Sequence, residues 1–218
     1  MLTSVIFASG KGERMREITS SFWVPKHLLP LPQGETPVTR LAKQLTEFSQ
    51  RIICIVEKGQ KELFDAKFLE VEMWNVEVYE REAGWENFIN DLQALQKIIW
   101  GSTWNILITT GDLVFEGESI KRQLQKMWAR EGKIDIVSDW ERLKVDGFKP
   151  PMRLVSIPSA LISSLVHQKI SPENIFSLIQ FALRNISMLP FVRIGFVHTL
   201  ANLNTPEDYT HILEVLEK

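Results

Sequence analysis

Glycines and basic side chains gather directly after the first apolar run of the chain. The run 2–8 is followed by Ser-Gly-Lys-Gly-Glu-Arg-Met. Gly10 and Gly12 would let backbone N–H groups approach an anion without a Cβ in the way. An arginine can grip phosphate oxygens in pairs, whereas a lysine acts as a point charge. The cations within reach are Lys11, Arg14, Arg16 and Lys26. An ordinary tight turn and a phosphate-holding loop are the two alternatives at this point.

Two well-known phosphate motifs do not describe this loop. A dinucleotide fingerprint needs a third glycine where this chain has Met15. A P-loop needs a Gly-Lys-Ser/Thr triplet, and the loop has none. The segment Pro25 to Pro30 follows shortly afterwards, and Lys26 stands in what we expect to be a fixed extended stretch between the prolines. That placement favours a lysine that is held in position.

A single carboxylate follows a second apolar run. The run 104–110 ends in Thr-Thr and is followed by Gly111-Asp112, so Asp112 would project from the end of a strand. Magnesium in proteins is held by a few carboxylates together with phosphate oxygens and water. Gly111-Asp112 is also a good turn sequence, so a plain turn is the alternative.

Apolar periodicity predicts the elements that must position these side chains. Short β-branched runs alternate with segments of helical spacing, which predicts a mostly parallel sheet covered by helices. Thr205 and Pro206 predict the start of a terminal helix. Strands are expected at 2–8, 52–56, 76–79, 104–110, 134–137, 152–157 and 191–197. Helices are expected at 36–48, 60–69, 85–99, 120–128, 158–168 and 171–184, and after 205, with a loop at 144–151.

Composition limits the classes of protein. The 218 residues carry a formal charge of −2, so no overall field drives the chain onto nucleic acid or an anionic membrane. The one cysteine, Cys54, lies in an apolar run and is expected in the core. No stretch is long and apolar enough to span a bilayer, and we see no signal peptide, so we expect a cytoplasmic protein. Seven tryptophans leave self-association open.

The N-terminal motifs resemble the nucleotidyltransferase superfamily, which includes sugar-1-phosphate nucleotidyltransferases and molybdenum-cofactor guanylyltransferases. That family has a loop Gly-x-Gly-x-Arg-(Leu/Met) and then Pro-Lys-x-Leu-Leu-Pro. The matching residues are Gly10, Gly12, Arg14, Met15, Pro25, Lys26, Leu28, Leu29 and Pro30. The spacing from Arg14 to Lys26 is longer than in the sugar-phosphate branch, so we expect a bulge around Phe22-Trp23. The resemblance implies a three-layer α/β fold with a mostly parallel mixed sheet, like the nucleotide-diphospho-sugar transferases (Rossmann-like).

The same resemblance implies a set of roles. Arg14 and Lys26 would be catalytic, and Asp112 with Asn202 would hold Mg²⁺. The substrates would be a nucleoside triphosphate and a small phosphorylated acceptor. Acceptor contacts are expected from Lys149 and Asn204, and nucleotide contacts from Ala8, Ser9, Gly10, Lys11, Gly12, Gly84, Asn87 and Gly111. A single domain, 1–218, would bind the nucleotide through about residues 1–140 and the acceptor through about 141–218.

Departures from the family pattern keep alternatives open. Sugar-phosphate members carry an aspartate where this chain has Asn202, and Asn202-x-Asn204 is more similar to the molybdenum-cofactor branch. The favoured hypothesis is transfer of a nucleotidyl group to a sugar 1-phosphate with release of pyrophosphate. The alternatives are a molybdenum-cofactor-type guanylyl- or cytidylyltransferase, and a nucleotide-binding homologue without catalysis. A glycosyltransferase of similar fold is disfavoured because the chain lacks an Asp-x-Asp motif.

Overall fold

A computed structural model provides the fold. It describes residues 2–9, 12–81, 95, 97–99, 105–115, 119–127, 134–139, 152–159, 192–197 and 199–217, and the statements below refer to these residues. The predicted loop at 144–151 and nearly all of the predicted helices at 158–168 and 171–184 lie outside them. Of the helix predicted at 85–99, residues 95 and 97–99 are described and are helical.

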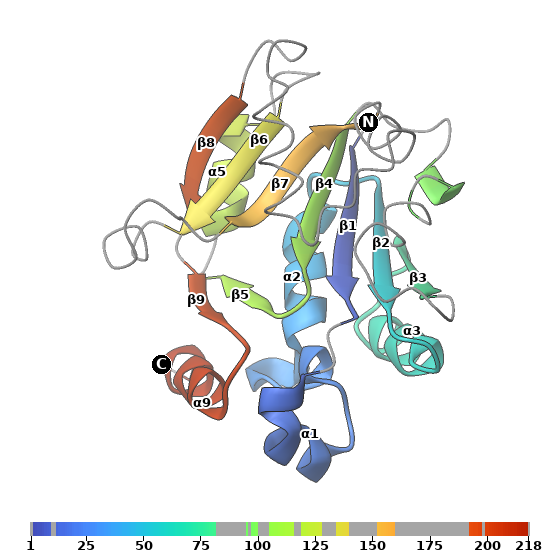
Figure 1. The fold of residues 1–218 in the computed structure, drawn as a ribbon, viewed down its shortest axis with the longest axis vertical. Helices are drawn as coiled ribbons and strands as arrows, with labels where there is room; N and C mark the ends of the chain where they lie inside the picture. The colour runs from blue at the N-terminus through green and yellow to red at the C-terminus, as the bar shows by residue number, and fades with distance from the viewer. Residues whose placement is uncertain are drawn as a thin grey trace.

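A seven-stranded sheet forms the centre of the molecule, in the order β3-β2-β1-β4-β7-β6-β8 (Figure 1). Only β7 runs antiparallel to its neighbours β4 and β6. The mostly parallel mixed sheet that the sequence predicted is therefore confirmed. The strands are β1 (Leu2–Ala8), β2 (Arg51–Val56), β3 (Val76–Glu80), β4 (Asn105–Thr110), β6 (Ile134–Asp139), β7 (Met152–Pro158) and β8 (Val192–Val197).

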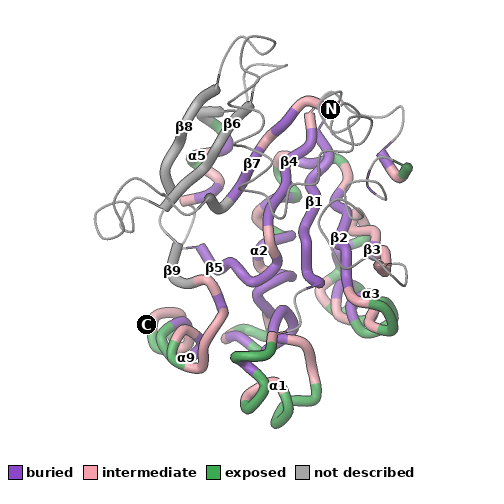
Figure 2. Tube along the Cα trace, in the orientation of Figure 1, coloured by how far each residue is buried: buried purple, intermediate pink, exposed green. Residues whose placement is uncertain are grey.

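The central strands are buried on both faces. Every residue of β1 is buried, as are all but the first of β2 (Figure 2). Continuous apolar strands of this kind are typical of parallel sheets that helices cover on both sides. Cys54 lies in this core, and burial raises the pKa of its thiol, which fits the predicted structural role.

Helices and a small second sheet complete the described structure. β5 (Leu113–Phe115) pairs antiparallel with β9 (Thr199–Asn202), beside the carboxyl end of β4. This two-stranded sheet was not predicted from the sequence. The helices are α1 (Arg16–Phe22), α2 (Pro37–Thr46), α3 (Lys61–Glu70), α5 (Ser119–Met127) and α9 (Pro206–Leu216), with 3₁₀ turns η1 (Glu13–Met15), η2 (Lys26–Leu28) and η3 (Pro32–Gly34).

Local sequence explains where α2 and α9 begin. Thr36 precedes α2 and Thr205 precedes α9, and each hydroxyl accepts the backbone N–H of the third helical residue. Each helix has proline at its first position, where the missing N–H costs nothing. The predicted cap at Thr205 is confirmed, and Asp208 completes it by accepting the N–H of Thr205 at 2.9 Å.

The segment around Lys26 corrects one prediction. We expected an extended stretch between Pro25 and Pro30, but Lys26–Leu28 form the 3₁₀ turn η2. A proline restricts the residue before it, and Leu29 is indeed extended, but Lys26 does not precede a proline. The N–H of Leu28 therefore closes a turn onto the carbonyl of Pro25 at 2.9 Å. This turn buries the side chains of Lys26 and His27.

Helix α1 occupies most of the segment between Arg14 and Lys26, where we expected a bulge around Phe22-Trp23. The helix ends at Phe22, and Trp23 follows in a left-handed conformation with φ 55°. Trp23 is 90% exposed and Phe22 is 46% exposed. In Figure 1, α1 and α9 both lie beyond the carboxyl ends of β1 and β4. Among the described residues, no helix is long and apolar enough to cross a membrane.

Candidate active site

The loop after β1 reaches the carboxyl edge of the sheet. Ala8 and Ser9 are buried there, while Gly10 and Lys11 lie outside the described residues. Gly12 has φ 61°, which favours glycine, and its carbonyl accepts the N–H of Met15 at 2.8 Å. A Cβ on Gly12 would lie 3.5 Å from the Lys26 side chain, so the loop passes directly over the lysine stem.

Met15, which stands where a dinucleotide fingerprint would have its third glycine, is part of the apolar core. Its side chain is fully buried in a second apolar cluster, together with Leu29, Leu31 and two residues of α9, Tyr209 and Ile212. The hydroxyl of Tyr209 also donates to the carbonyl of Pro30 at 2.6 Å. The glycine loop, the Pro-Lys motif and the C-terminal helix are therefore packed together, although the sequence separates them widely.

Lys26 is the centre of this arrangement. Its Nζ donates to Asp112 Oδ2 at 2.6 Å, to the carbonyl of Leu203 at 3.1 Å and to Asn204 Oδ1 at 3.2 Å. The lysine and aspartate side chains are only 8% and 12% exposed. One buried ammonium group thus joins the N-terminal motif, the end of β4 and the turn before α9.

Sheet topology accounts for the position of Asp112. β1 and β4 are adjacent and parallel, so the loops at their carboxyl ends meet. The N–H of Gly111 donates to the carbonyl of Phe7 at 2.9 Å. A Cβ on Gly111 would lie 3.1 Å from the Ala8 Cβ and 3.2 Å from Ile6 Cγ2, so a larger residue would require these neighbours to shift by a few tenths of an ångström.

Asn202 lies beside Asp112. It pairs in register with Leu113 across the β5–β9 ladder, and the N–H of Leu203 donates to the carbonyl of Asp112 at 2.8 Å. Asp112 Oδ1 and Asn202 Oδ1 are both buried and have no hydrogen-bond partner among the described residues. Buried oxygens are normally hydrogen-bonded, so each of these two oxygens is available to a cation or a water molecule.

Few side chains in the described structure could bind a metal ion at this position. In the part of the chain that the structure describes, no three histidine, cysteine, aspartate or glutamate residues cluster as a metal site. One carboxylate oxygen and one amide oxygen suit Mg²⁺, which usually takes most of its ligands from phosphates and water. The residues present therefore fit a divalent ion that is held jointly with a phosphorylated ligand.

Electrostatics keep Asp112 ionised. Burial is the largest influence and would raise the pKa of its carboxyl, but Lys26, His27 and a hydrogen bond from the Thr110 side chain together outweigh it, and the pKa is lowered. His27 is buried next to Lys26, with its ring centroid 6.4 Å from that of Phe64. Burial lowers the pKa of His27 to about 4, partly opposed by the charge of Asp112, so the imidazole is neutral at pH 7.

The remaining predicted site residues are less constrained. Arg14 is exposed in η1, at the mouth of the loop that carries Gly12. Gly84, Asn87 and Lys149 lie outside the described residues. The structure thus brings together Lys26, Gly111, Asp112, Asn202 and Asn204, together with Ala8, Ser9 and Gly12 of the loop.

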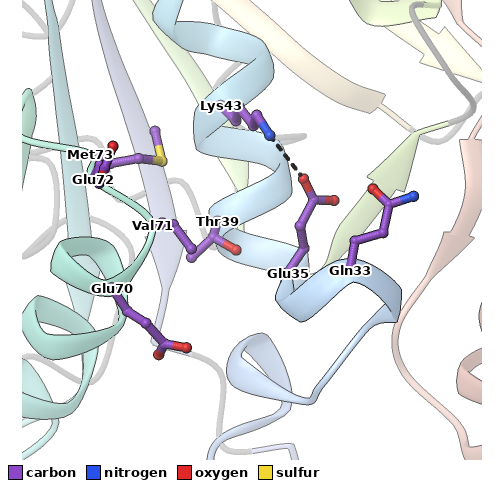
Figure 3. Close-up of a pocket in the computed structure, with 8 residues that line it drawn as sticks. All are labelled: Gln33, Glu35, Thr39, Lys43, Glu70, Val71, Glu72 and Met73. Carbon is purple, nitrogen blue, oxygen red and sulfur yellow. Dashed lines mark hydrogen bonds and ion pairs between the residues drawn. The ribbon is translucent and has the colours of Figure 1, made fainter.

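A separate cavity of about 280 Å³ lies between α2 and the end of α3 (Figure 3). Its walls carry Glu35 and Lys43 on one side and Glu70 and Glu72 on the other. None of the predicted site residues lines it. Glu35 is already paired with Arg40 at 2.8 Å, so this cavity offers no obvious centre for the chemistry above.

Comparison with known proteins identifies the family. The sequence model of the nucleotidyl transferase family matches residues 3–141, and the chain belongs to that family. That span contains the glycine loop, Lys26 and Asp112. A search of curated protein sequences finds no significant match.

Solved structures show the fold. The inositol-1-phosphate CTP transferase of T. maritima is similar, with TM-score 0.73, 15% identity and coverage of 99% of this chain and 96% of that one. A putative glucose-1-phosphate thymidylyltransferase from Bacillus anthracis has TM-score 0.74, 12% identity and coverage of 100% and 96%. Rv0371C of Mycobacterium tuberculosis, in complex with manganese, has TM-score 0.62, 16% identity and coverage of 98% and 97%. The nucleotide-diphospho-sugar transferase fold that the sequence predicted is confirmed.

Proposed function

We propose that the protein transfers a nucleoside monophosphate from a nucleoside triphosphate to a small phosphorylated acceptor, with a sugar 1-phosphate as the favoured class. The observation that carries the proposal is the buried Lys26–Asp112 pair, 2.6 Å apart, beneath the glycine loop of a nucleotidyl transferase. The similar solved structures include enzymes named for sugar phosphate and inositol phosphate substrates, which supports this acceptor class.

The reaction needs no covalent nucleophile on the protein. An oxygen of the acceptor phosphate attacks the α-phosphorus, a new P–O bond forms, and the bond to the bridging oxygen of pyrophosphate breaks. Positioning and charge neutralisation carry most of the catalysis in such transfers. We assign to Lys26 the stabilisation of the negative charge that builds up on the α-phosphate in the transition state. We assign to Arg14 and the backbone N–H groups of the loop at 8–12 the binding of the departing pyrophosphate and the stabilisation of its negative charge.

Mg²⁺ is the proposed cofactor, and Asp112 Oδ1 and Asn202 Oδ1 are the protein oxygens that would hold it. When bound, it would neutralise negative charge on the triphosphate. The unsatisfied state of both oxygens supports this assignment. A structure with the same fold is a complex with manganese, which supports the use of a divalent ion.

Base and acceptor recognition complete the proposal. We assign Gly84 and Asn87 to the base, and Lys149 and Asn204 to the acceptor phosphate. Asn204 is the one of these within the described residues, and its amide already contacts Lys26. Residues 1–140 would then bind the nucleotide, and residues 141–218 the acceptor.

Pyrophosphate release tests this function. Each of the four ribonucleoside triphosphates would be combined with Mg²⁺ and a panel of sugar 1-phosphates and other phosphorylated acceptors. We expect release with one base and one acceptor class. Asp112→Asn and Lys26→Met should each reduce kcat/KM by roughly 100-fold or more, because the first removes the carboxylate that would hold Mg²⁺ and the second removes the positive charge assigned to the α-phosphate. Asp65→Asn, a surface aspartate paired with Lys61, is the matched control and should keep full activity.

Two specific observations favour second candidates. Asn202-x-Asn204 favours a molybdenum-cofactor-type guanylyl- or cytidylyltransferase, which a pterin phosphate acceptor in the same panel would reveal. The full engagement of Lys26 by Asp112 and Asn204 favours a nucleotide-binding homologue without catalysis. That candidate predicts that the protein binds a nucleotide but releases no pyrophosphate from it in the presence of any acceptor. This outcome would overturn the transferase proposal.

A further inference from the structure

The hydrogen bonds of Lys26 join two segments from opposite ends of the chain. Its Nζ donates to the carbonyl of Leu203 at 3.1 Å and to Asn204 Oδ1 at 3.2 Å, both just before α9. Lys26 itself lies in η2, near the start of the sequence. The direction of its ammonium group therefore depends on how the segments 24–31 and 199–217 are held against each other.

Apolar packing is one of the interactions that hold these segments. Leu29 and Leu31 share a buried cluster with Leu203 and with two residues of α9, Tyr209 and Ile212. Apolar attraction has no preferred direction, whereas a hydrogen bond weakens steeply when its distance or angle changes. A hydrogen bond between the segments would therefore define their relative position more sharply than the apolar contacts do.

Tyr209 makes such a hydrogen bond. Its hydroxyl donates to the carbonyl of Pro30 at 2.6 Å, and the tyrosine is only 6% exposed. Among the residues that the structure describes, this is the only hydrogen bond between segments 24–31 and 199–217 apart from those of Lys26. Because it is short and largely shielded from water, we expect it to restrain both segments.

Both ends of Tyr209 act close to Lys26. The N–H of Tyr209 donates to the carbonyl of Thr205 at 3.3 Å, so the tyrosine also belongs to the first turn of α9. On the other side, the N–H of Leu29, next to Pro30, donates to the carbonyl of Lys26 at 3.4 Å. Tyr209 thus connects the backbone that carries the lysine with the turn that supplies two of its acceptors.

We propose that Tyr209 is a positioning residue for the transfer reaction: its bond to Pro30 holds the start of α9 where it directs Lys26 toward the α-phosphate. The inference rests on the function proposed above. Lys26 is assigned there to charge that builds up in the transition state, so a misdirected ammonium group should slow the reaction more than it weakens substrate binding.

Steady-state kinetics of Tyr209→Phe test this role. The change removes one hydroxyl and keeps the buried ring, so we expect the protein to fold. The kcat for pyrophosphate release should fall by about tenfold, while the KM values of both substrates stay within about twofold. Tyr79→Phe is the matched control, because it removes a hydroxyl that donates to Glu77 at 2.8 Å on β3, and it should change neither constant.

A second variant separates positioning from a general loosening of α9. Ile212→Val shortens a fully buried side chain of the same apolar cluster and removes no hydrogen-bonding group. It should lower the melting temperature by an amount similar to that of Tyr209→Phe but keep the wild-type kcat. An equal fall of kcat in both variants would overturn the proposal, since lost stability would then explain it.

Trace labelling of lysine amines tests the same contact without any enzymatic reaction. A small amount of acetic anhydride would be added, and the label on Lys26 measured relative to that on Lys43, whose side chain is 76% exposed. Tyr209→Phe should raise this ratio by about threefold or more, because a turn that is held less firmly exposes Lys26 to the reagent more often. Tyr79→Phe should leave the ratio unchanged.

The outcomes separate this inference from the function on which it rests. Tyr209→Phe with an unchanged kcat would overturn the positioning role and leave the transferase standing. A lower kcat with an unchanged labelling ratio would overturn the route through Lys26. Wild-type protein that releases no pyrophosphate would overturn the proposed function. In that case a raised labelling ratio would still support the hold of Tyr209 on Lys26, and an unchanged ratio would overturn it.

Discussion

His27 shows how one residue of a functional motif can serve the fold. Its neighbour Lys26 points at Asp112, whereas the imidazole is buried against Phe64 with its Nδ1 unpartnered among the described residues. The His27 Cδ2 would lie 3.4 Å from a Cβ on Gly111, so the ring packs under the turn that presents Asp112. We therefore regard His27 as a packing residue that supports this turn.

The lowered pKa of His27 predicts acid sensitivity. An unfolded histidine takes up a proton near pH 6.5, but the folded chain resists protonation until about pH 4. The contribution of the neutral His27 to the free energy of unfolding is therefore fully present above pH 6.5. It falls by on the order of 3 kcal/mol as the pH drops toward 4. Asp112, whose pKa is lowered below its usual value, loses its contribution at still lower pH.

Urea denaturation at pH 7 and pH 4.5 measures this effect. His27→Gln should lose less stability over that interval than wild type, because no imidazole remains to be protonated. His211→Gln, at an exposed position of α9, is the matched control and should behave like wild type. An equal loss in His27→Gln and wild type would contradict the account of the buried imidazole.

At the scale of elements, α9 fixes the turn that contacts Lys26. Asp208 Oδ2 accepts the N–H groups of Asn204 and Thr205, and the Thr205 hydroxyl accepts that of Asp208 at 3.3 Å. This capping box holds residues 203–205 at the helix N-terminus, where Leu203 and Asn204 offer oxygens to Lys26. The helix start therefore serves the site as well as the core.

Removing the cap should destabilise the protein modestly. Thr205→Ala is expected to cost about 1 kcal/mol, because the first turn of α9 loses an acceptor for its N–H groups. For a chain of this size the melting temperature should fall by roughly 2–4 °C. Thr210→Ala, on the exposed face of the same helix, removes only a hydroxyl bonded to the Pro206 carbonyl, and calorimetry should show a smaller shift. Equal shifts would argue against the cap.

Sequence periodicity predicted the long elements well, because buried strands and amphipathic helices leave repeating patterns. β1, β2 and α2 fall within a few residues of their predicted ranges. The three-residue strand β5 and its partner β9 were missed, since so short a ladder has no period of its own. The 3₁₀ turn at Lys26–Leu28 was also missed, and the contact of its lysine with Asp112 is a tertiary one that the local sequence does not show.

At the scale of the whole molecule, the site depends on contacts that span the chain. Residues at the end of β4 could be predicted to meet the loop after β1, because adjacent parallel strands share one edge of the sheet. The bonds from Lys26 to Leu203 and Asn204 could not, since they cross nearly the full sequence. The roles of Gly84, Asn87 and Lys149 stay predictions.

The position of an isotopic label distinguishes nucleotidyl transfer from other reactions of the triphosphate. Nucleoside triphosphate labelled in the α-phosphate, and separately in the γ-phosphate, would be incubated with Mg²⁺ and the acceptor that supports pyrophosphate release. For nucleotidyl transfer, we expect the α label in the acceptor conjugate and the γ label in pyrophosphate, and we expect both products to disappear in Asp112→Asn. A γ label in the acceptor would indicate a kinase, and a γ label in inorganic phosphate would indicate hydrolysis. Either result would contradict nucleotidyl transfer.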